Sequence, residues 1–146
     1  MDKKTISLIN GYLEKAEEKL CSAETLMRNS RYDDTVSRAY YSAFHAAQAV
    51  LLTEGLFVRS HSGLINLFGL HFVRTGKIEQ EYGRFLSDLK DKRENGDYEI
   101  YSAIEKGVAE ESIRNARRFL ERIRLYLKKE LGSPSSKKRK RENNSL

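Results

Sequence analysis

The sequence lacks the residues and motifs that mark several common classes of protein. It contains one cysteine, Cys21, which excludes a disulfide framework within the chain and a zinc site built from cysteines. No apolar run approaches the roughly 20 residues of a membrane span, and the first residues lack the apolar core of a signal peptide. We therefore expect a cytoplasmic protein that does not enter membranes, with Cys21 packed as a small buried hydrophobe.

Metal-binding and phosphate-binding motifs are missing too. His45, His61 and His71 are too far apart in the sequence to form a local pair of ligands, and no His-Glu-x-x-His is present. The chain has neither a glycine-rich phosphate loop nor the Gly-x-Ser-x-Gly of a hydrolase. We expect no metal and no cofactor, and the one alternative is a metal site that folding assembles from distant residues.

Positive charge is concentrated near the end of the chain. The net charge is +6, and the residues after Leu131 carry five basic side chains and one acidic, so they account for four of these charges. We predict one helical domain over 1–131 and a disordered basic tail over 132–146. The tail would either add salt-sensitive binding of RNA or serve as a solvated terminus that aids solubility.

The apolar residues recur at three- and four-residue steps, without the alternation of strands, which predicts an all-α fold. We expect an up-and-down bundle of four to five helices. Asp33 or Asp34 would cap the second helix, and Asn95-Gly96-Asp97 would form a turn after the fourth. The predicted helices span about 5–28, 35–53, 64–74, 79–93 and 108–130.

The second predicted helix carries a polar and aromatic stripe, Arg38-Ala-Tyr-Tyr-Ser-Ala-Phe-His45, which must face something other than water. Arg38 and His45 are seven positions apart, so both lie on nearly one face, roughly 10 Å apart along the backbone. Both side chains would contact one phosphate only if the Arg38 side chain extended along the helix. In the alternative interpretation, Tyr40, Tyr41 and His45 satisfy their hydrogen bonds at a seam between helices or subunits.

A second candidate is Arg93-Glu-Asn-Gly-Asp-Tyr98, which crosses the expected end of a helix and a turn, where functional residues are common. An arginine, an acid and a phenol within six residues suit binding of a phosphate or a base edge. In the alternative interpretation, Asp97 caps the next segment and Tyr98 packs on the core.

Three segments, taken in order, resemble the HEPN domain in its prokaryotic branch. They are Arg38–His45 with the two alanines after it, Ser60–Phe68 with its continuation to Gly76, and Arg93–Tyr98, and Ala116-Arg-Arg-Phe119 in the last helix fits as well. The resemblance covers about residues 5–130 and implies a helical bundle that is usually a homodimer. It also implies a minimal nucleotidyltransferase as a partner, in a pair like a toxin and its antitoxin.

Active HEPN proteins are metal-independent RNases that use an arginine, four to six variable residues and then a histidine. By this resemblance Arg93 is the arginine that holds phosphate, while Tyr98 stands where the acid/base histidine is expected. A phenol titrates near ~10 and an imidazole near ~6.5, so at pH 7 tyrosine falls short as a base by about 4 kcal/mol. Arg38 and His45 fit the same spacing, but they lie on the second predicted helix, which is not where the family carries this motif. His45 is the alternative source of the missing imidazole.

Three hypotheses follow. The first is a homodimeric HEPN-type module that binds a nucleotide or RNA through Arg93, Asp97 and Tyr98, with Arg38 as a further binding candidate. The second is a weak metal-independent RNase, whose catalytic residues would be Arg93 with Tyr98 or with His45. The third is a helical interaction scaffold without a ligand, favoured by the nearly balanced charge of the body.

Overall fold

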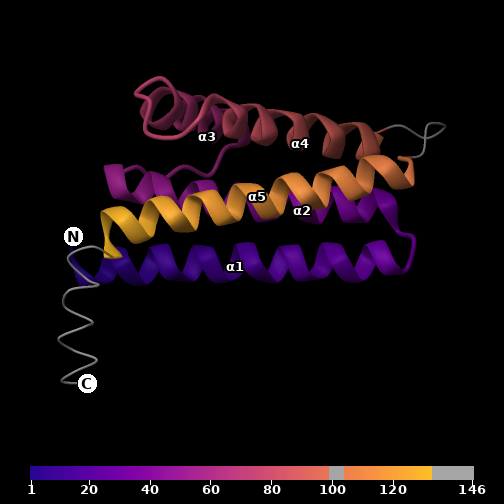
Figure 1. Ribbon diagram of the computed structural model, residues 1–146, viewed down its shortest axis with the longest axis horizontal. Helices are drawn as coiled ribbons and strands as arrows, with labels where there is room; N and C mark the ends of the chain where they lie inside the picture. The colour runs from indigo at the N-terminus through magenta and orange to yellow at the C-terminus, as the bar shows by residue number, and fades with distance from the viewer. Residues whose placement is uncertain (99–103, 133–146) are drawn as a thin grey trace, which may run out of the picture.

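The computed structural model describes residues 1–98 and 104–132, without the side chains of 96–98. Over these ranges the chain forms five α-helices and no strand, which confirms the predicted all-α fold. Figure 1 shows α1, α2 and α5 running side by side, with α3 and α4 on the other side of α2 and α5 from α1. The elements are α1 (Lys3–Arg28), α2 (Tyr32–Leu51), the 3₁₀ turn η1 (Leu52–Glu54), α3 (His61–Phe68), the π-helical segment η2 (Gly69–Val73), α4 (Gln80–Tyr98) and α5 (Lys106–Glu130).

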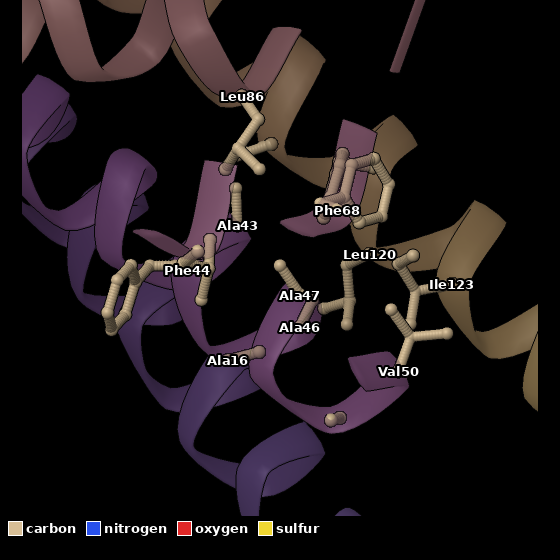
Figure 2. Close-up of a cluster of buried hydrophobic side chains, with 14 of the residues drawn as sticks. Ala16, Ala43, Phe44, Ala46, Ala47, Val50, Phe68, Leu86, Leu120 and Ile123 are labelled. Atoms are coloured by element: carbon tan, nitrogen blue, oxygen red, sulfur yellow. The ribbon is translucent and has the colours of Figure 1, made fainter. Parts of the chain in front are cut away.

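Helix α2 is the centre of the bundle, because it packs against α1, α4 and α5. Its small residues allow this close approach, and all five of its alanines are fully buried: Ala39, Ala43, Ala46, Ala47 and Ala49. In Figure 2, Ala43, Ala46 and Ala47 lie among larger side chains from α3, α4 and α5, including Phe68, Leu86 and Ile123. Burial of this apolar surface is the main force that holds the bundle together.

The start of α2 differs from the prediction. The helix begins at Tyr32, so Asp33 and Asp34 lie inside its first turn and neither caps it. Ser30 has a positive φ of 59°, which reverses the chain earlier than the aspartates suggest. Both carboxylates still face the positive end of the helix dipole, and Asp33 Oδ1 accepts a hydrogen bond from the Ile104 amide at 3.2 Å.

The predicted turn at Asn95-Gly96-Asp97 is also wrong, because α4 continues to Tyr98. An Asn-Gly pair disfavours a helix by only about 1 kcal/mol at the glycine, and tertiary contacts outweigh that preference. Lys90 pairs with Glu94 at 2.8 Å within the helix, and Lys92 pairs with Glu111 of α5 at 2.7 Å. Both ion pairs lie in the turns of α4 just before the Asn-Gly pair.

Cys21 is exposed, which corrects the expectation of a buried thiol. On α1 the residues that face the core are Ala16, Leu20 and Ala23, and Cys21 projects away from that row. The adjacent Leu20 is therefore the core residue at this level of the helix.

The tail, 133–146, lies outside the described residues, so its predicted disorder stays a prediction.

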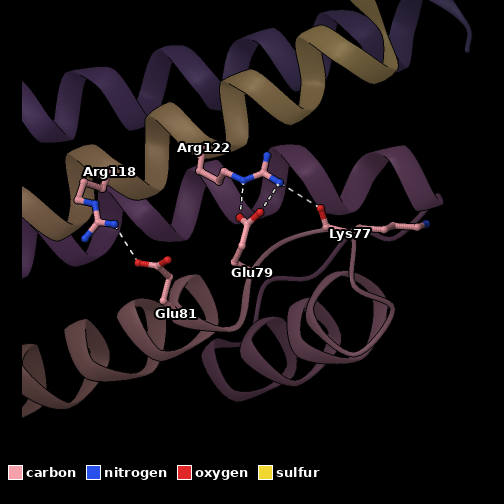
Figure 3. Close-up of polar contacts among 5 residues, drawn as sticks. All are labelled: Lys77, Glu79, Glu81, Arg118 and Arg122. Atoms are coloured by element: carbon pink, nitrogen blue, oxygen red, sulfur yellow. Dashed lines mark hydrogen bonds and ion pairs between the residues drawn. The ribbon is translucent and has the colours of Figure 1, made fainter.

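Polar contacts join the beginning of α4 to α5. Figure 3 shows Arg122 forming two hydrogen bonds with the Glu79 carboxylate, at 2.7 and 3.3 Å, and a third with the Lys77 carbonyl at 3.2 Å. One turn away, Arg118 bonds to Glu81 at 2.9 Å. These contacts set the position of α4 on the bundle.

Within the described ranges, no helix is both long and apolar enough to cross a membrane.

Candidate functional site

The candidate site begins with a hydrogen bond between α2 and the start of α3. Ser60 caps α3 by accepting a hydrogen bond from the Gly63 amide, so His61 becomes the first residue of that helix. There the imidazole stacks on the Tyr40 ring, with centroids 5.5 Å apart, and its Nδ1 lies 2.6 Å from the Tyr40 hydroxyl. The cap thus places a histidine directly over the polar stripe of α2.

The Tyr40 hydroxyl determines which nitrogen of His61 carries the proton. Tyr40 is fully buried, and burial raises the pKa of its phenol well above the ordinary range, so the hydroxyl keeps its hydrogen. Among the described residues, His61 Nδ1 is the only hydrogen-bond partner of that hydroxyl. A buried donor without an acceptor costs about 1–3 kcal/mol, so Tyr40 donates to Nδ1. The neutral imidazole then carries its hydrogen on Nε2.

Helix α4 brings positive charge to the same place. The Arg93 guanidinium lies over the Tyr41 ring, 5.4 Å from its centroid, and Tyr41 in turn meets His61 edge to face at 5.8 Å. Partial burial and the charges of Arg93 and Lys90 lower the pKa of His61, while Glu94 opposes them. His61 is therefore held neutral at pH 7, beside a permanent cation.

This arrangement suits an anion. A neutral imidazole with its hydrogen on Nε2 donates a hydrogen bond, and the Arg93 guanidinium adds a full positive charge. Glu94 pairs with Lys90, and that hydrogen bond lowers the pKa of Glu94. The carboxylate thus partly neutralises the lysine. We call Tyr40, Tyr41, His61, Lys90 and Arg93 the arginine cluster.

The other sequence-predicted residues lie apart from one another or cannot be placed. Arg38 is exposed and lines a shallow hollow on α1 and α2 with Lys19, Ser22 and Thr25. His45 Nδ1 bonds to Gln48 at 2.8 Å, and its ring stacks on Tyr12 of α1. The side chains of Asp97 and Tyr98 lie outside the described residues, so their predicted part in the site stays a prediction.

Comparison with known proteins places the chain in a family. The sequence profile of the HEPN domain matches residues 9–128. This chain belongs to the HEPN family. Among its relatives, a protein of Methanocaldococcus jannaschii named as a candidate toxin is 42% identical over 120 residues, which cover 82% of this chain and 89% of the relative.

Two relatives of this HEPN domain carry the name UPF0332 protein. One, from Thermotoga maritima, is 35% identical over 116 residues, or 80% of this chain and 88% of the relative. The other, from Pyrococcus horikoshii, is 48% identical over 79 residues, or 54% of this chain and 56% of the relative. These likenesses cover most of the helical bundle and include toxin-like proteins.

The imidazole that lies beside Arg93 in this HEPN domain is His61, a residue that sequence reasoning did not select as a site. The one available signal was Ser60 directly before a helix-compatible run, because a serine cap fixes where α3 starts. Among the described residues, no group of three or more His, Cys, Asp or Glu side chains is placed to hold a metal ion.

Proposed function

We propose that this HEPN domain binds the phosphate groups of a nucleotide or RNA at the arginine cluster, as the homodimeric toxin-like member of a pair with a nucleotidyltransferase. The observation that supports binding is the 2.6 Å hydrogen bond from Tyr40 to His61 Nδ1, since it makes Nε2, the other ring nitrogen of His61, a donor. A donor beside Arg93 complements a phosphate oxygen. The same donor is poorly suited to remove a proton.

The electrostatics favour a phosphate ester over a neutral ligand. Arginine binds phosphate through two parallel N–H groups, and such charge-assisted hydrogen bonds are about twice as strong as neutral ones. The Tyr41 ring beneath Arg93 offers a flat aromatic surface next to the charge, which suits the base of a nucleotide. Phosphate binding at Arg93 with a base on or near Tyr41 is therefore the interaction that we propose.

A weak RNase is the second candidate function, because an arginine and an imidazole do lie together in this site. To act as a general base, His61 would need its lone pair on Nε2 and its hydrogen on Nδ1. The Tyr40 hydrogen would then lose its acceptor, at a cost of about 1–3 kcal/mol, or roughly 5- to 150-fold in the population of the reactive form. Binding without efficient cleavage is the expected behaviour.

Binding is tested with uridine monophosphate and a short RNA, by NMR titration and calorimetry. Arg93→Lys keeps the charge but removes the planar fork, and we expect it to weaken binding roughly 10-fold; Arg93→Ala should weaken it further. Arg84→Ala, an exposed arginine on the same helix, is the matched control and should have no effect. If Arg93→Ala left the affinity for both probes unchanged, phosphate binding at this cluster would be wrong.

Cleavage is tested on single-stranded and structured RNA without metal. We expect a slow reaction or none, and any true reaction must disappear in both Arg93→Ala and His61→Gln. If His45→Gln abolished cleavage while His61→Gln did not, the imidazole would come from the second helix instead. Rapid cleavage that depended on His61 would show that the donor assignment is wrong.

The homodimer and the partner rest on the family resemblance and on relatives named as candidate toxins. One chain has a mass of 16.9 kDa, and sedimentation equilibrium of the full chain should give twice that mass. Co-purification with a minimal nucleotidyltransferase from the same genome tests the partner. A monomer at micromolar concentration that also fails to retain the transferase would overturn the homodimer and the partner, and the titrations alone would then decide between phosphate binding and a scaffold without a ligand.

A further inference from the structure

A second surface, made by α1, α2 and the loop before α3, carries a row of partly exposed aromatic rings. Tyr41 lies 6.3 Å from His45, His45 lies 6.1 Å from Tyr12, and Tyr12 lies 6.3 Å from Phe57, measured between ring centroids. Phe57, at the end of the row, is 50% exposed. We call these four rings the aromatic row. It begins at Tyr41, which the arginine cluster also uses.

Hydrogen bonds fix the loop that carries Phe57. His45 Nδ1 bonds to the Gln48 side-chain oxygen, and the Gln48 amide donates to the Val58 carbonyl at 3.0 Å. Val58 is the next residue after Phe57, so the chain of bonds from α2 positions this ring. An exposed phenylalanine held in a fixed position is a preformed contact surface, which loses little conformational entropy when it binds a ligand.

Basic side chains border the aromatic row. On α1, Tyr12, Lys15 and Lys19 recur at three- and four-residue steps and share one face. Glu14 projects from the other side, and Glu18 lies at the edge of the shared face, three residues after Lys15. The charges of both lysines act on His45. Arg38 lines a hollow with Lys19, and the Arg59 guanidinium lies 5.1 Å from the centre of the Phe57 ring.

These four cations differ in their ion pairing from the arginines of α5. Among the described residues, Lys15, Lys19, Arg38 and Arg59 form no ion pair with a carboxylate, whereas several arginines of α5 do. The paired arginines and their partners are Arg117 with Glu24, Arg118 with Glu81, Arg122 with Glu79, and Arg124 with Glu17. The aromatic row is therefore bordered by positive charge that the folded chain does not neutralise.

We propose that the aromatic row is a base-stacking site for single-stranded RNA, whose phosphates follow the four cations toward Arg93. This rests on the proposed function, because it extends the ligand from one phosphate at the arginine cluster to several nucleotides. Stacked rings next to a basic track are the combination by which proteins bind single strands without reading their sequence. A second copy of the chain is the less suitable occupant, since it would bury four cations that have no carboxylate here.

The experiment compares uridine monophosphate with an oligouridylate of about ten nucleotides, by NMR titration and fluorescence anisotropy on the full chain. We expect Phe57→Ala to weaken the oligonucleotide roughly 5- to 100-fold and to leave the monophosphate unchanged. Phe57→Tyr should restore binding, because a phenol ring also stacks. Leu125→Ala, which removes an exposed apolar side chain from α5, is the control and should match the unmodified chain.

The salt dependence of oligonucleotide binding is a second measurement. A change in its slope, unlike a loss of affinity, does not arise from unfolding of a variant. The double variant Lys15→Gln and Lys19→Gln should make the salt dependence of oligonucleotide binding shallower by about 1.4, at 0.7 for each phosphate contact. An unchanged oligonucleotide affinity in Phe57→Ala, or an unchanged slope in the lysine variant, would overturn the stacking site. So would conversion of a dimer to a monomer by Phe57→Ala, which would make the row a contact between copies.

The two proposals fail in different ways. If the monophosphate binds through Arg93 but the oligonucleotide binds no more tightly, the aromatic row is not an RNA site and the arginine cluster stands. If the oligonucleotide binds through Phe57 but Arg93→Ala changes nothing, the phosphate site is misplaced, and the proposed path toward Arg93 is wrong. If neither probe binds, both proposals fall.

Discussion

Replacing Tyr40 with phenylalanine removes a single oxygen from the centre of the site and leaves the ring that packs against Tyr41, Phe44 and His61. The hydroxyl donates the 2.6 Å hydrogen bond to His61 Nδ1. Because the donor and part of its partner are buried, we expect the free energy of unfolding to fall by about 1 kcal/mol. The stacked rings should hold the overall position of α3.

The same change should alter the titration of His61. A hydrogen bond donated to Nδ1 stabilises the neutral imidazole, so its loss should raise the pKa of His61 from its lowered value toward the ordinary one. Arg93 and Lys90 remain, so the pKa should not rise above that ordinary value. His61 would also be free to exchange its hydrogen between Nδ1 and Nε2.

NMR with ¹⁵N-labelled histidine measures both effects, since the two ring nitrogens have different shifts when protonated. In the unmodified protein at neutral pH, we expect His61 to hold its hydrogen on Nε2, and in Tyr40→Phe we expect a mixture of the two forms. Urea unfolding of both proteins gives the stability difference. A hydrogen found on Nδ1 in the unmodified protein would refute the donor assignment and favour the RNase.

Three further predictions concern stability, measured by urea unfolding. Phe68→Ala should cost about 3–5 kcal/mol, because Phe68 is fully buried against Phe72 and Phe119, and a loss below 1 kcal/mol would contradict this packing. Ser42→Ala should be neutral or stabilise by up to about 1 kcal/mol, since the buried hydroxyl has no hydrogen-bond partner among the described residues. Burial lowers the pKa of both His45 and His61 below the ordinary 6.5. As the pH drops through 6.5, the unfolded chain therefore takes up protons before the folded chain does. The free energy of unfolding should be constant above about pH 7 and should fall as the pH drops through 6.5. If the loss began only below about pH 4.5, the lowered pKa values of carboxylates such as Glu79 would be its cause instead.

The predicted ends of the helices show where local sequence signals stop being decisive. Asp33 and Asp34 are favourable anywhere in the first turn of a helix, so their presence could not fix the starting residue. Asn95-Gly96 marks a turn in an isolated segment, but in the folded chain α4 continues through it to Tyr98, after the turn in which Lys92 pairs with Glu111 of α5. Such a pair joins residues that are distant in the sequence, and local propensity carries no information about it.

The sequence by itself determined the all-α fold and a bundle of four to five helices, because apolar periodicity acts locally and survives any arrangement of the bundle. It also pointed to Arg93. The central position of α2 came only from the packing of the helices. Only the tertiary structure decided that His61 lies beside that arginine and that Tyr40 fixes its proton, since the bonded pair is separated by 21 residues. It likewise decided which cations stay unneutralised, because ion pairs across helices depend on how the helices face one another.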